Sequence, residues 1–368
     1  NSLLKDFAFG FAAGDYGYMV NTEYESGLQN SYVVRFDFDT FSNVTVLNLN
    51  INMGVMSGFA VGGYGYIISY DSGKVVRFDL AFDGGNAGAG QESVSLLDLS
   101  NVISSTENFS GGFAAGGYGY LVPFFDSSNY SYHGKLVRFD IAAFHHDYVS
   151  VMDLMITNAE LMGFIAGFSK GDYGYLLPVE SGKVVRFDLD TFDNVTVLVL
   201  ARYDDTFSSG ERRSPTTYNQ GVDGFAVGDY GYFTQYYGNV FRFDLVTFDN
   251  NNVILREGLN ISSTHPFEDC FEKDGYGYFV PSPYYGGTVV VRFDLTIFDS
   301  DEDSVSSLLK ELDISGVFGG NLGFRSGFAG HGHGYLVPSN MGSSFNYAGH
   351  GKVVRFDLLT EPEPEPEP

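Results

Sequence analysis

The sequence predicts an all-β protein, a seven-bladed β-propeller with four antiparallel strands in each blade. Two short motifs that alternate along the chain indicate this fold. An apolar residue followed by Arg-Phe-Asp occurs seven times, as in Gly73–Leu80, Gly182–Leu189 and Gly351–Leu358. Tyr-Gly-Tyr or a close variant precedes each copy, and successive glycines of this second motif are 46 to 57 residues apart. Self-similarity at such a period is typical of propellers.

Each repeat contains four segments of strand length that end at turn residues. The first is Gly-Phe-Ala-x-Gly, found at Gly10–Gly14, Gly58–Gly62, Gly112–Gly116 and Gly224–Gly228. The second is Tyr-Gly-Tyr with the apolar residues after it, and the third is the Val-Arg-Phe-Asp strand. The fourth alternates β-branched and polar residues, as in Val44–Leu49. Gly and Ala suit a crowded innermost strand, whereas the fourth segment suits the outermost position.

The two ends of the chain predict how the ring closes. The last repeat stops after its third strand, at Leu358, and residues 2–7 stand where a fourth strand would precede the first Gly-Phe-Ala. We expect this N-terminal strand to complete the last blade, because closure removes exposed sheet edges. The sequence therefore predicts a propeller over residues 1–360 and a separate tail over 361–368.

The tail repeats Glu-Pro four times. Alternating Pro forbids both helix and sheet, so the segment is expected to be an extended, polyproline-type strut. We expect it to contact a neighbouring subunit through the assembly residues Glu361, Pro362, Glu363, Pro364, Glu365, Pro366, Glu367 and Pro368.

Composition excludes several classes of protein. The net charge of −26 argues against nucleic acid as a partner, because neutralising phosphates needs a basic surface. No stretch approaches the ~20 apolar residues that span a bilayer. The single cysteine, Cys270, excludes an internal disulfide and is interpreted as a small buried residue.

The Arg and Asp of the third strand are interpreted as structural residues. Seven near-identical copies favour pairing with each other, with Tyr hydroxyls or with backbone between blades, since a catalytic site is seldom present once per blade. The arginines are Arg35, Arg77, Arg138, Arg186, Arg242, Arg292 and Arg355, and the aspartates are Asp37, Asp79, Asp140, Asp188, Asp244, Asp294 and Asp357.

Candidate metal ligands are few, and the sequence predicts no cofactor. Asp299, Asp301 and Asp303 place oxygens at alternate positions, as calcium loops do, but the loop lacks the central Gly and closing Glu of that motif. His331 and His333 share one face of a strand, without a Cys or paired carboxylate to complete a site. His145 and His146 would point to opposite faces of a strand. Calcium is the open alternative, and no catalytic motif is present.

Five Asn-x-Ser/Thr sequons predict N-glycosylation and an extracellular, secreted protein. Asn43 and Asn194 occupy the same site of the repeat, at the entry to the outermost strand, and the others are expected in accessible loops. The sequons are Asn43, Asn108, Asn129, Asn194 and Asn260.

The complete repeat, Gly-Phe-Ala-x-Gly-x-Tyr-Gly-Tyr followed by Gly-Lys-Val-Val-Arg-Phe-Asp-Leu, resembles propeller repeats of the broad YVTN and kelch-like group. It also looks like tandem repeats in predicted secreted glycoproteins of algae and other protists. The resemblance covers residues 2–358 and implies the fold. Members of the group are adhesion, scaffold and binding modules, with a minority of enzymes, so it implies no catalytic residue here.

Three functions stay open at this point. The leading hypothesis is a non-enzymatic glycoprotein propeller that self-associates into a filament or surface layer through its tail. The alternative is a module that binds a glycan or protein on the face with the long loops, 201–223 and 124–133. The third is a polysaccharide lyase or hydrolase, which predicts that ionisable side chains from different blades meet at the channel mouth, outside the repeat motifs.

Overall fold

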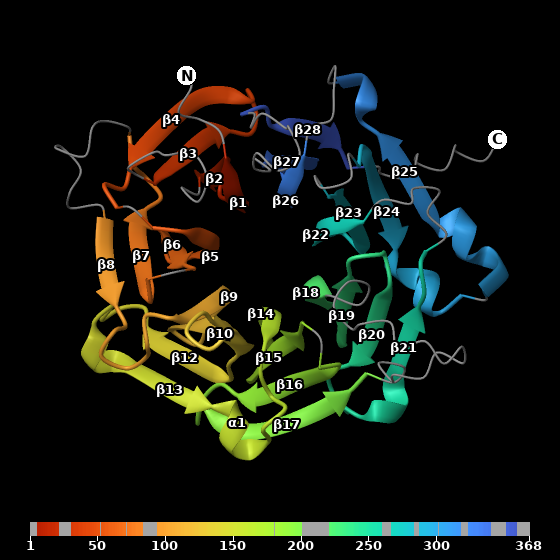
Figure 1. Ribbon diagram of the computed structural model, residues 1–368. Coiled ribbons are helices and arrows are strands. Elements are labelled where there is room, and N and C mark those ends of the chain that lie inside the picture. Colours follow the sequence, from red (N-terminus) through yellow and green to blue (C-terminus); the bar gives the residue numbers. More distant parts are fainter. Residues whose placement is uncertain are drawn as a thin grey trace, which may run out of the picture.

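The computed structural model confirms a seven-bladed β-propeller, with the blades arranged radially around a central axis (Figure 1). It describes residues 6–21, 31–51, 53–70, 72–83, 94–179, 181–200, 221–259, 266–282, 287–300, 302–317, 323–339 and 351–358. In this part of the chain no helix is long and apolar enough to cross a membrane.

Each blade is an antiparallel sheet whose strands follow chain order from the axis outward. Blade 1 contains β1 (Phe7–Ala13), β2 (Tyr16–Asn21), β3 (Tyr32–Asp37) and β4 (Ser42–Asn48). Blade 2 contains β5 (Val55–Val61), β6 (Tyr64–Ser69), β7 (Lys74–Asp79) and β8 (Val94–Asp98). Blade 3 contains β9 (Glu107–Ala115), β10 (Tyr118–Asp126), β12 (Lys135–Asp140) and β13 (Val149–Asp153), with the short β11 (Ser131–Tyr132) paired to β10.

The remaining blades repeat this order. Blade 4 contains β14 (Phe164–Lys170), β15 (Tyr173–Pro178), β16 (Lys183–Asp188) and β17 (Asp193–Val199). Blade 5 contains β18 (Gly221–Val227), β19 (Tyr230–Gln235), β20 (Val240–Asp244) and β21 (Val253–Arg256). Blade 6 contains β22 (Phe267–Lys273), β23 (Tyr276–Pro281), β24 (Val289–Asp294) and β25 (Leu309–Asp313). Blade 7 contains β26 (Phe324–Gly330), β27 (His333–Pro338) and β28 (Val354–Asp357).

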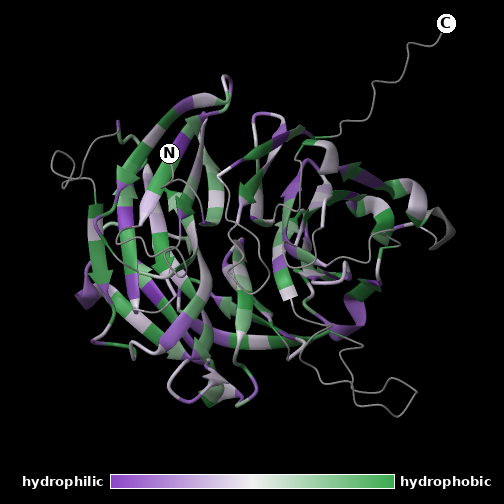
Figure 2. Ribbon diagram, turned by 45° about the horizontal axis from the view of Figure 1, so that its top comes forward, coloured by the Kyte–Doolittle hydropathy of each residue, from purple (hydrophilic) through white to green (hydrophobic). Residues whose placement is uncertain are grey.

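The helical segments are short and lie in connections. They are η2 (His146–Tyr148), α1 (Leu154–Thr157), η3 (Asn250–Asn252), η5 (Leu295–Phe298), η6 (Glu302–Leu308) and η7 (Ser315–Val317). Along the strands hydrophobic and hydrophilic residues alternate, as Figure 2 shows. This alternation is expected where apolar faces pack between neighbouring blades.

The ring closes between blades 1 and 7. Innermost strands of neighbouring blades contact one another all round the ring, including β1 with β26. Phe7, Phe38 and Tyr335 belong to one buried apolar cluster that joins the two blades. Phe7 itself pairs with Asn21 inside blade 1. The closing strand was predicted over residues 2–7, but Phe7 belongs to β1 of blade 1 instead of blade 7. Residues 2–5 lie outside the described residues, as does the tail.

The four first strands whose bounds the sequence indicated begin earlier than expected, by three residues in blades 1, 2 and 5 and by five in blade 3. The second glycine of the predicted segment lies beyond the strand, in the turn, where Gly14 and Gly116 have φ of 56° and 57°. Such left-handed backbone favours glycine, which explains the residue at this place. The predicted order, with the Gly- and Ala-rich strand innermost and the alternating strand outermost, is confirmed.

The Tyr-Gly-Tyr glycine makes room for the phenylalanine of Arg-Phe-Asp. The two residues face each other across the second and third strands, as Gly174 faces Phe187. A Cβ added at Gly174 would lie 2.2 Å from Cζ of this buried ring, which leaves no space for any side chain. The same pairing is present in all seven blades, with such a Cβ 2.1 to 2.4 Å from the nearest ring atom.

Aromatic stacks join the first two strands of every blade. The phenylalanine of Gly-Phe-Ala stacks on the second tyrosine of Tyr-Gly-Tyr; Phe113 and Tyr120, for example, have ring centroids 5.0 Å apart. The hydroxyl of Tyr120 then donates to the carbonyl oxygen of Leu189 in the next blade, at 3.3 Å. The tyrosine therefore packs within its own blade and bonds to the next one.

Candidate functional site

A β-bulge at the second or fourth residue of each innermost strand shapes the wall of the central channel. In blade 1, Phe7 pairs with Asn21 and Phe9 with Val20, so Ala8 is an extra residue. The same irregularity adds one residue in the other six blades. Because a bulge bends the strand locally, two consecutive side chains can face the channel instead of one.

Each blade therefore contributes two adjacent residues, here called its channel pair. From blade 1 to blade 7 the channel pairs are Ala8-Phe9, Met56-Ser57, Ser110-Gly111, Ile165-Ala166, Val222-Asp223, Glu268-Asp269 and Arg325-Ser326. They line a cavity of about 590 Å³ on the propeller axis. Blades 1 to 4 supply apolar, small or hydroxyl-bearing residues, whereas blades 5 to 7 supply all the charges.

The charges lie toward one end of the channel. Successive strands of a blade run in opposite directions. The first strand therefore begins at the rim where the chain enters the blade from the preceding one, and the loop between the second and third strands lies at this same rim. We call this the loop rim; Tyr236, in such a loop, also lines the cavity. The opposite, hairpin rim carries the tight turns such as Gly14–Asp15. The channel pairs lie near the loop rim.

Asp223 and Asp269 form a carboxyl pair between blades 5 and 6. Their side chains lie close enough to influence each other's pKa. Burial raises the pKa of Asp223 well above its usual range, and repulsion from Asp269 adds to this. Burial raises the pKa of Asp269 to about 6, although the Gly327 N–H, which donates to its Oδ2 at 2.9 Å, opposes the shift. Both carboxyls therefore bind their protons more tightly than an ordinary aspartate does, because burial disfavours the charged form of each group.

Glu268 and Arg325 complete the charged part of the wall. Burial raises the pKa of Glu268, and the positive charge of Arg325 partly offsets this. The hydroxyl of Ser282 donates to Oε2 of Glu268 at 3.1 Å. A guanidinium and three carboxyl groups thus face one cavity, which can present hydrogen-bond donors and acceptors to a polar ligand.

The repeat arginines lie between neighbouring blades and outside the channel. Arg138 is flanked by the rings of Tyr118 and Phe192, at 4.5 Å and 4.4 Å from their centroids, and donates to the carbonyl of Leu189 at 3.1 Å. Tyrosine and phenylalanine rings flank the arginine similarly in other blades. These contacts join blade to blade, as cation–π packing of a half-buried guanidinium allows.

The repeat aspartates close the turn that follows their strand. Oδ1 of Asp188 accepts hydrogen bonds from the backbone N–H of Asp190 at 3.0 Å and of Thr191 at 2.9 Å. Hydrogen bonds from the Thr191 amide and hydroxyl lower the pKa of this carboxyl. Asp37, Asp140 and Asp244 accept from turn amides in the same way.

Asp299, His331 and His333, which the sequence offered as metal ligands, do not gather into one site. Oδ1 of Asp299 accepts from Nη1 of Arg242 at 2.8 Å. Asp301 and the side chain of Asp303 lie outside the described part of the structure. His331 faces two carboxylates of blade 1, Asp15 at 3.4 Å and Asp39 at 3.2 Å. His333 faces Asp357 instead, at 3.1 Å.

The structure corrects one glycosylation prediction. Asn108 lies inside β9 with 4% of its surface exposed, so it is not in an accessible loop and its side chain has no room for a glycan. Asn43, Asn129 and Asn194 are exposed, and Asn43 and Asn194 occupy equivalent places in β4 and β17. Asn260 lies outside the described residues. Cys270 is buried, as predicted.

Sequence reasoning missed the channel charges. A signal was available, because Asp223, Asp269 and Ser326 align with one another and with Ala166 of blade 4, immediately before the first-strand glycine or its substitute. Residues of the innermost strand that differ from blade to blade, in a sequence that is otherwise repeated, indicate the positions that line the channel. They were hidden because the charges are scattered over a hundred residues and form no local motif.

Comparison with solved structures shows what this ring resembles. Kuenenia stuttgartiensis hydrazine synthase matches with a TM-score of 0.61 and 12% identity, over 98% of this chain and 97% of that one. A computationally designed protein, Ika8, matches with a TM-score of 0.52 and 8% identity, over 96% of this chain and 97% of that one. The likeness is one of fold. No protein-family model matches the chain, and no curated protein does.

Proposed function

We propose that this chain is a non-enzymatic binding propeller that takes a glycan residue into its channel from the loop rim. One observation carries the proposal. Asp223, Asp269 and Arg325, from three consecutive blades, face one cavity, while blades 1 to 4 have uncharged channel pairs. Charges that serve only the scaffold would be expected to recur in every blade, as the arginines of Arg-Phe-Asp do.

The chemistry of the wall favours a neutral, hydroxyl-rich ligand. Sugar hydroxyls both donate and accept hydrogen bonds, and the wall offers partners of both kinds, the Arg325 guanidinium as a donor and the carboxyl groups of Asp269 and Glu268 as acceptors. Phe9 and Ile165, from the blades that flank the charged blades 5 to 7, supply apolar surface for a C–H face. An anion would meet the carboxylates of Asp269 and Glu268. The cavity of about 590 Å³ lies within the range of small-molecule sites.

Saturation-transfer NMR with a panel of free mono- and disaccharides, followed by calorimetry of any ligand found, tests this function. The key variant is Asp269→Ser, because Ser57 and Ser326 stand at the equivalent positions of blades 2 and 7. Loss of a charged hydrogen-bond partner should weaken binding by about tenfold or more. The matched control is Asp229→Ser, in the β18–β19 turn at the hairpin rim, which should bind like the unaltered protein. Binding by no sugar of the panel, or equal affinity of both variants, would refute the proposal.

The enzymatic alternative is favoured by the same carboxyl pair, since an acid beside its conjugate base can transfer protons. Its spacing is the counter-argument. Two-carboxylate glycosidases hold their carboxyl groups about 5 Å apart or more, which leaves room for the substrate between them, whereas Asp223 and Asp269 interact directly with each other. A lyase or hydrolase would release products from a bound oligosaccharide on prolonged incubation, which chromatography detects; binding without turnover is the result expected here.

The extracellular location, the N-glycans and self-association also belong to this proposal. Exposed sequons at Asn43, Asn129 and Asn194 support secretion. The Glu-Pro tail, 361–368, supports assembly with further copies, an argument from sequence alone. Negative-stain microscopy of the chain with and without the tail tests it. Filaments or ordered oligomers that vanish on truncation are expected, and single rings in both samples would contradict it.

A further inference from the structure

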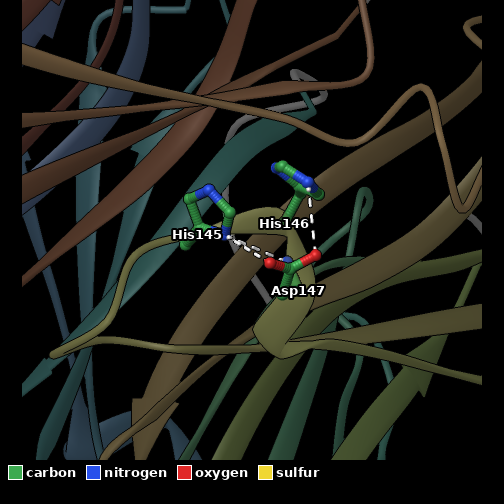
Figure 3. Close-up of side chains that lie close together, drawn as sticks. All are labelled: His145, His146 and Asp147. Carbon is green, nitrogen blue, oxygen red and sulfur yellow. Dashed lines mark hydrogen bonds and ion pairs between the residues drawn. The ribbon is translucent and has the colours of Figure 1, made fainter.

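The outer part of blade 3 carries a cluster that the channel function does not use. His145, His146 and Asp147 lie in the turn between β12 and β13, at the hairpin rim. The two imidazole rings are side by side, with centroids 4.1 Å apart, and both face the carboxylate of Asp147 (Figure 3). The histidines do not point to opposite faces, because the chain here is a 3-10 turn and not a strand.

The geometry points to a binding site for a transition-metal dication, Zn²⁺ foremost, formed by His145, His146 and Asp147. Nδ1 of His145 lies 3.3 Å from Oδ2 of Asp147, and Nε2 of His146 lies 3.3 Å from Oδ1. One ligand atom from each residue lies within 4.8 Å of the others. Zn²⁺ bonds of about 2.0–2.1 Å place neighbouring ligands of a tetrahedron about 3.3 Å apart. Nδ1 of His145 also accepts a hydrogen bond from the Asp147 N–H at 3.4 Å, which an ion bound to that nitrogen would replace.

The donor set selects the class of metal. Two imidazoles and one carboxylate suit Zn²⁺, Cu²⁺ or Ni²⁺, whereas Ca²⁺ and Mg²⁺ prefer oxygen ligands throughout. The side chains are 52%, 47% and 70% exposed, so an ion can reach them without any opening of the fold. Three protein ligands leave at least one coordination position for water or for a donor from another molecule.

The turn holds these ligands on a fixed backbone. Phe144 precedes them with its ring buried, and its N–H donates to the carbonyl of Asp140 at 3.0 Å. The N–H of Tyr148 donates to the carbonyl of His145 at 3.0 Å, which closes the 3-10 turn. A ligand set anchored at both ends loses less conformational freedom when it binds an ion.

Blade 5 provides the same turn without the imidazoles. There Phe248-Asp249-Asn250-Asn251-Asn252 replaces Phe144-His145-His146-Asp147-Tyr148. Phe144 and Phe248 both have left-handed backbone, with φ of 42° and 46°, and a 3-10 turn follows each. The histidines are therefore not required to build the turn.

Titration of the full-length, tag-free protein with Zn²⁺ by calorimetry tests the site, in excess Ca²⁺ so that carboxylate-only sites are occupied. The decisive variant carries His145→Asp, His146→Asn and Asp147→Asn, which gives residues 144–147 the sequence of residues 248–251 in blade 5. We expect one equivalent of Zn²⁺ to bind the unaltered protein. The variant should lose at least about tenfold in affinity, because losing even a residue that supports a metal ligand has an effect of this size.

Two controls separate this site from other histidines and from misfolding. His331→Gln with His333→Gln should leave Zn²⁺ binding unchanged, because these residues face separate carboxylates. The blade 3 variant should unfold at the same urea concentration as the unaltered protein. Selective broadening of the His145 and His146 NMR signals by Ni²⁺ would locate the ion independently. Absence of Zn²⁺ binding, or equal binding by the blade 3 variant, would overturn the inference.

Discussion

The substitution Asp269→Asn is expected to stabilise the propeller at neutral pH and to leave its stability at about pH 4 nearly unchanged. In the folded chain this carboxyl keeps its proton up to about pH 6, whereas its ordinary pKa is 3.8. Between these values the folded state binds more protons than the unfolded state, so the free energy of unfolding falls as pH rises. Above pH 6 the cost of the buried charge is fully developed.

The size of the effect follows from the pKa. A displacement from 3.8 to about 6 corresponds to about 3 kcal/mol. Asp269 keeps some contact with channel water, which screens its charge, so about 1–2 kcal/mol is the gain expected for the variant. Asparagine retains an oxygen for the Gly327 N–H and offers an amide donor to Asp223, so no hydrogen bond need be lost.

Urea unfolding, followed by circular dichroism in steps from about pH 4 to pH 8, measures this effect. Asp188→Asn is the matched control, because hydrogen bonds from Thr191 lower the pKa of Asp188. That carboxylate contributes stability above its unfolded pKa and loses it as pH falls, so its variant should be less stable at neutral pH and unchanged in acid. If Asp269→Asn is as stable as the unaltered protein at pH 7, or less stable, the reasoning about the carboxyl pair is wrong.

Two further predictions concern the scaffold. Gly174→Ala should lower the free energy of unfolding by about 1–3 kcal/mol or more, because the new Cβ overlaps the buried ring of Phe187. Adding Phe187→Leu should recover part of this loss in urea unfolding. A Gly174→Ala variant as stable as the unaltered protein would contradict the close packing. Tyr120→Phe should lower the free energy of unfolding by about 1 kcal/mol, because its hydrogen bond to the next blade is lost. Tyr66→Phe should lower it less, because the buried Tyr66 hydroxyl has no hydrogen-bond partner among the described residues. Equal losses of stability in thermal unfolding would count against the inter-blade hydrogen bond.

The sequence predicted the fold well because the fold is repeated. The glycine that faces Phe187, and the arginine flanked by Tyr118 and Phe192, are present in each blade for the same packing reason, so their periodicity gives the number of blades directly. The radial order also followed from composition. Strand ends did not, because the bulge that precedes each first-strand glycine or its substitute changes the pairing without changing the residue pattern.

The candidate sites could not be predicted in the same way. Asp223 and Asp269 meet only because two strands that are forty-odd residues apart in sequence lie next to each other in the ring. The convergence of His145 and His146 depends on a left-handed residue at Phe144, which turns the chain out of the strand. Both features come from backbone geometry, which residue spacing does not reveal.

The bulges also bring a variable pair of residues from each blade to the axis of a fold that is otherwise repeated. Some of these residues also join neighbouring blades, since the Ser110 hydroxyl donates to the carbonyl of Phe164 at 2.8 Å and Asp269 accepts from the Gly327 N–H, so a pair can vary freely only where it makes no such contact. Blade 4 carries Ile165-Ala166 and blade 6 carries Glu268-Asp269 on nearly the same strand pairing. The channel wall can therefore vary in sequence on a constant backbone. A new ligand preference needs new residues at these positions and no change of fold.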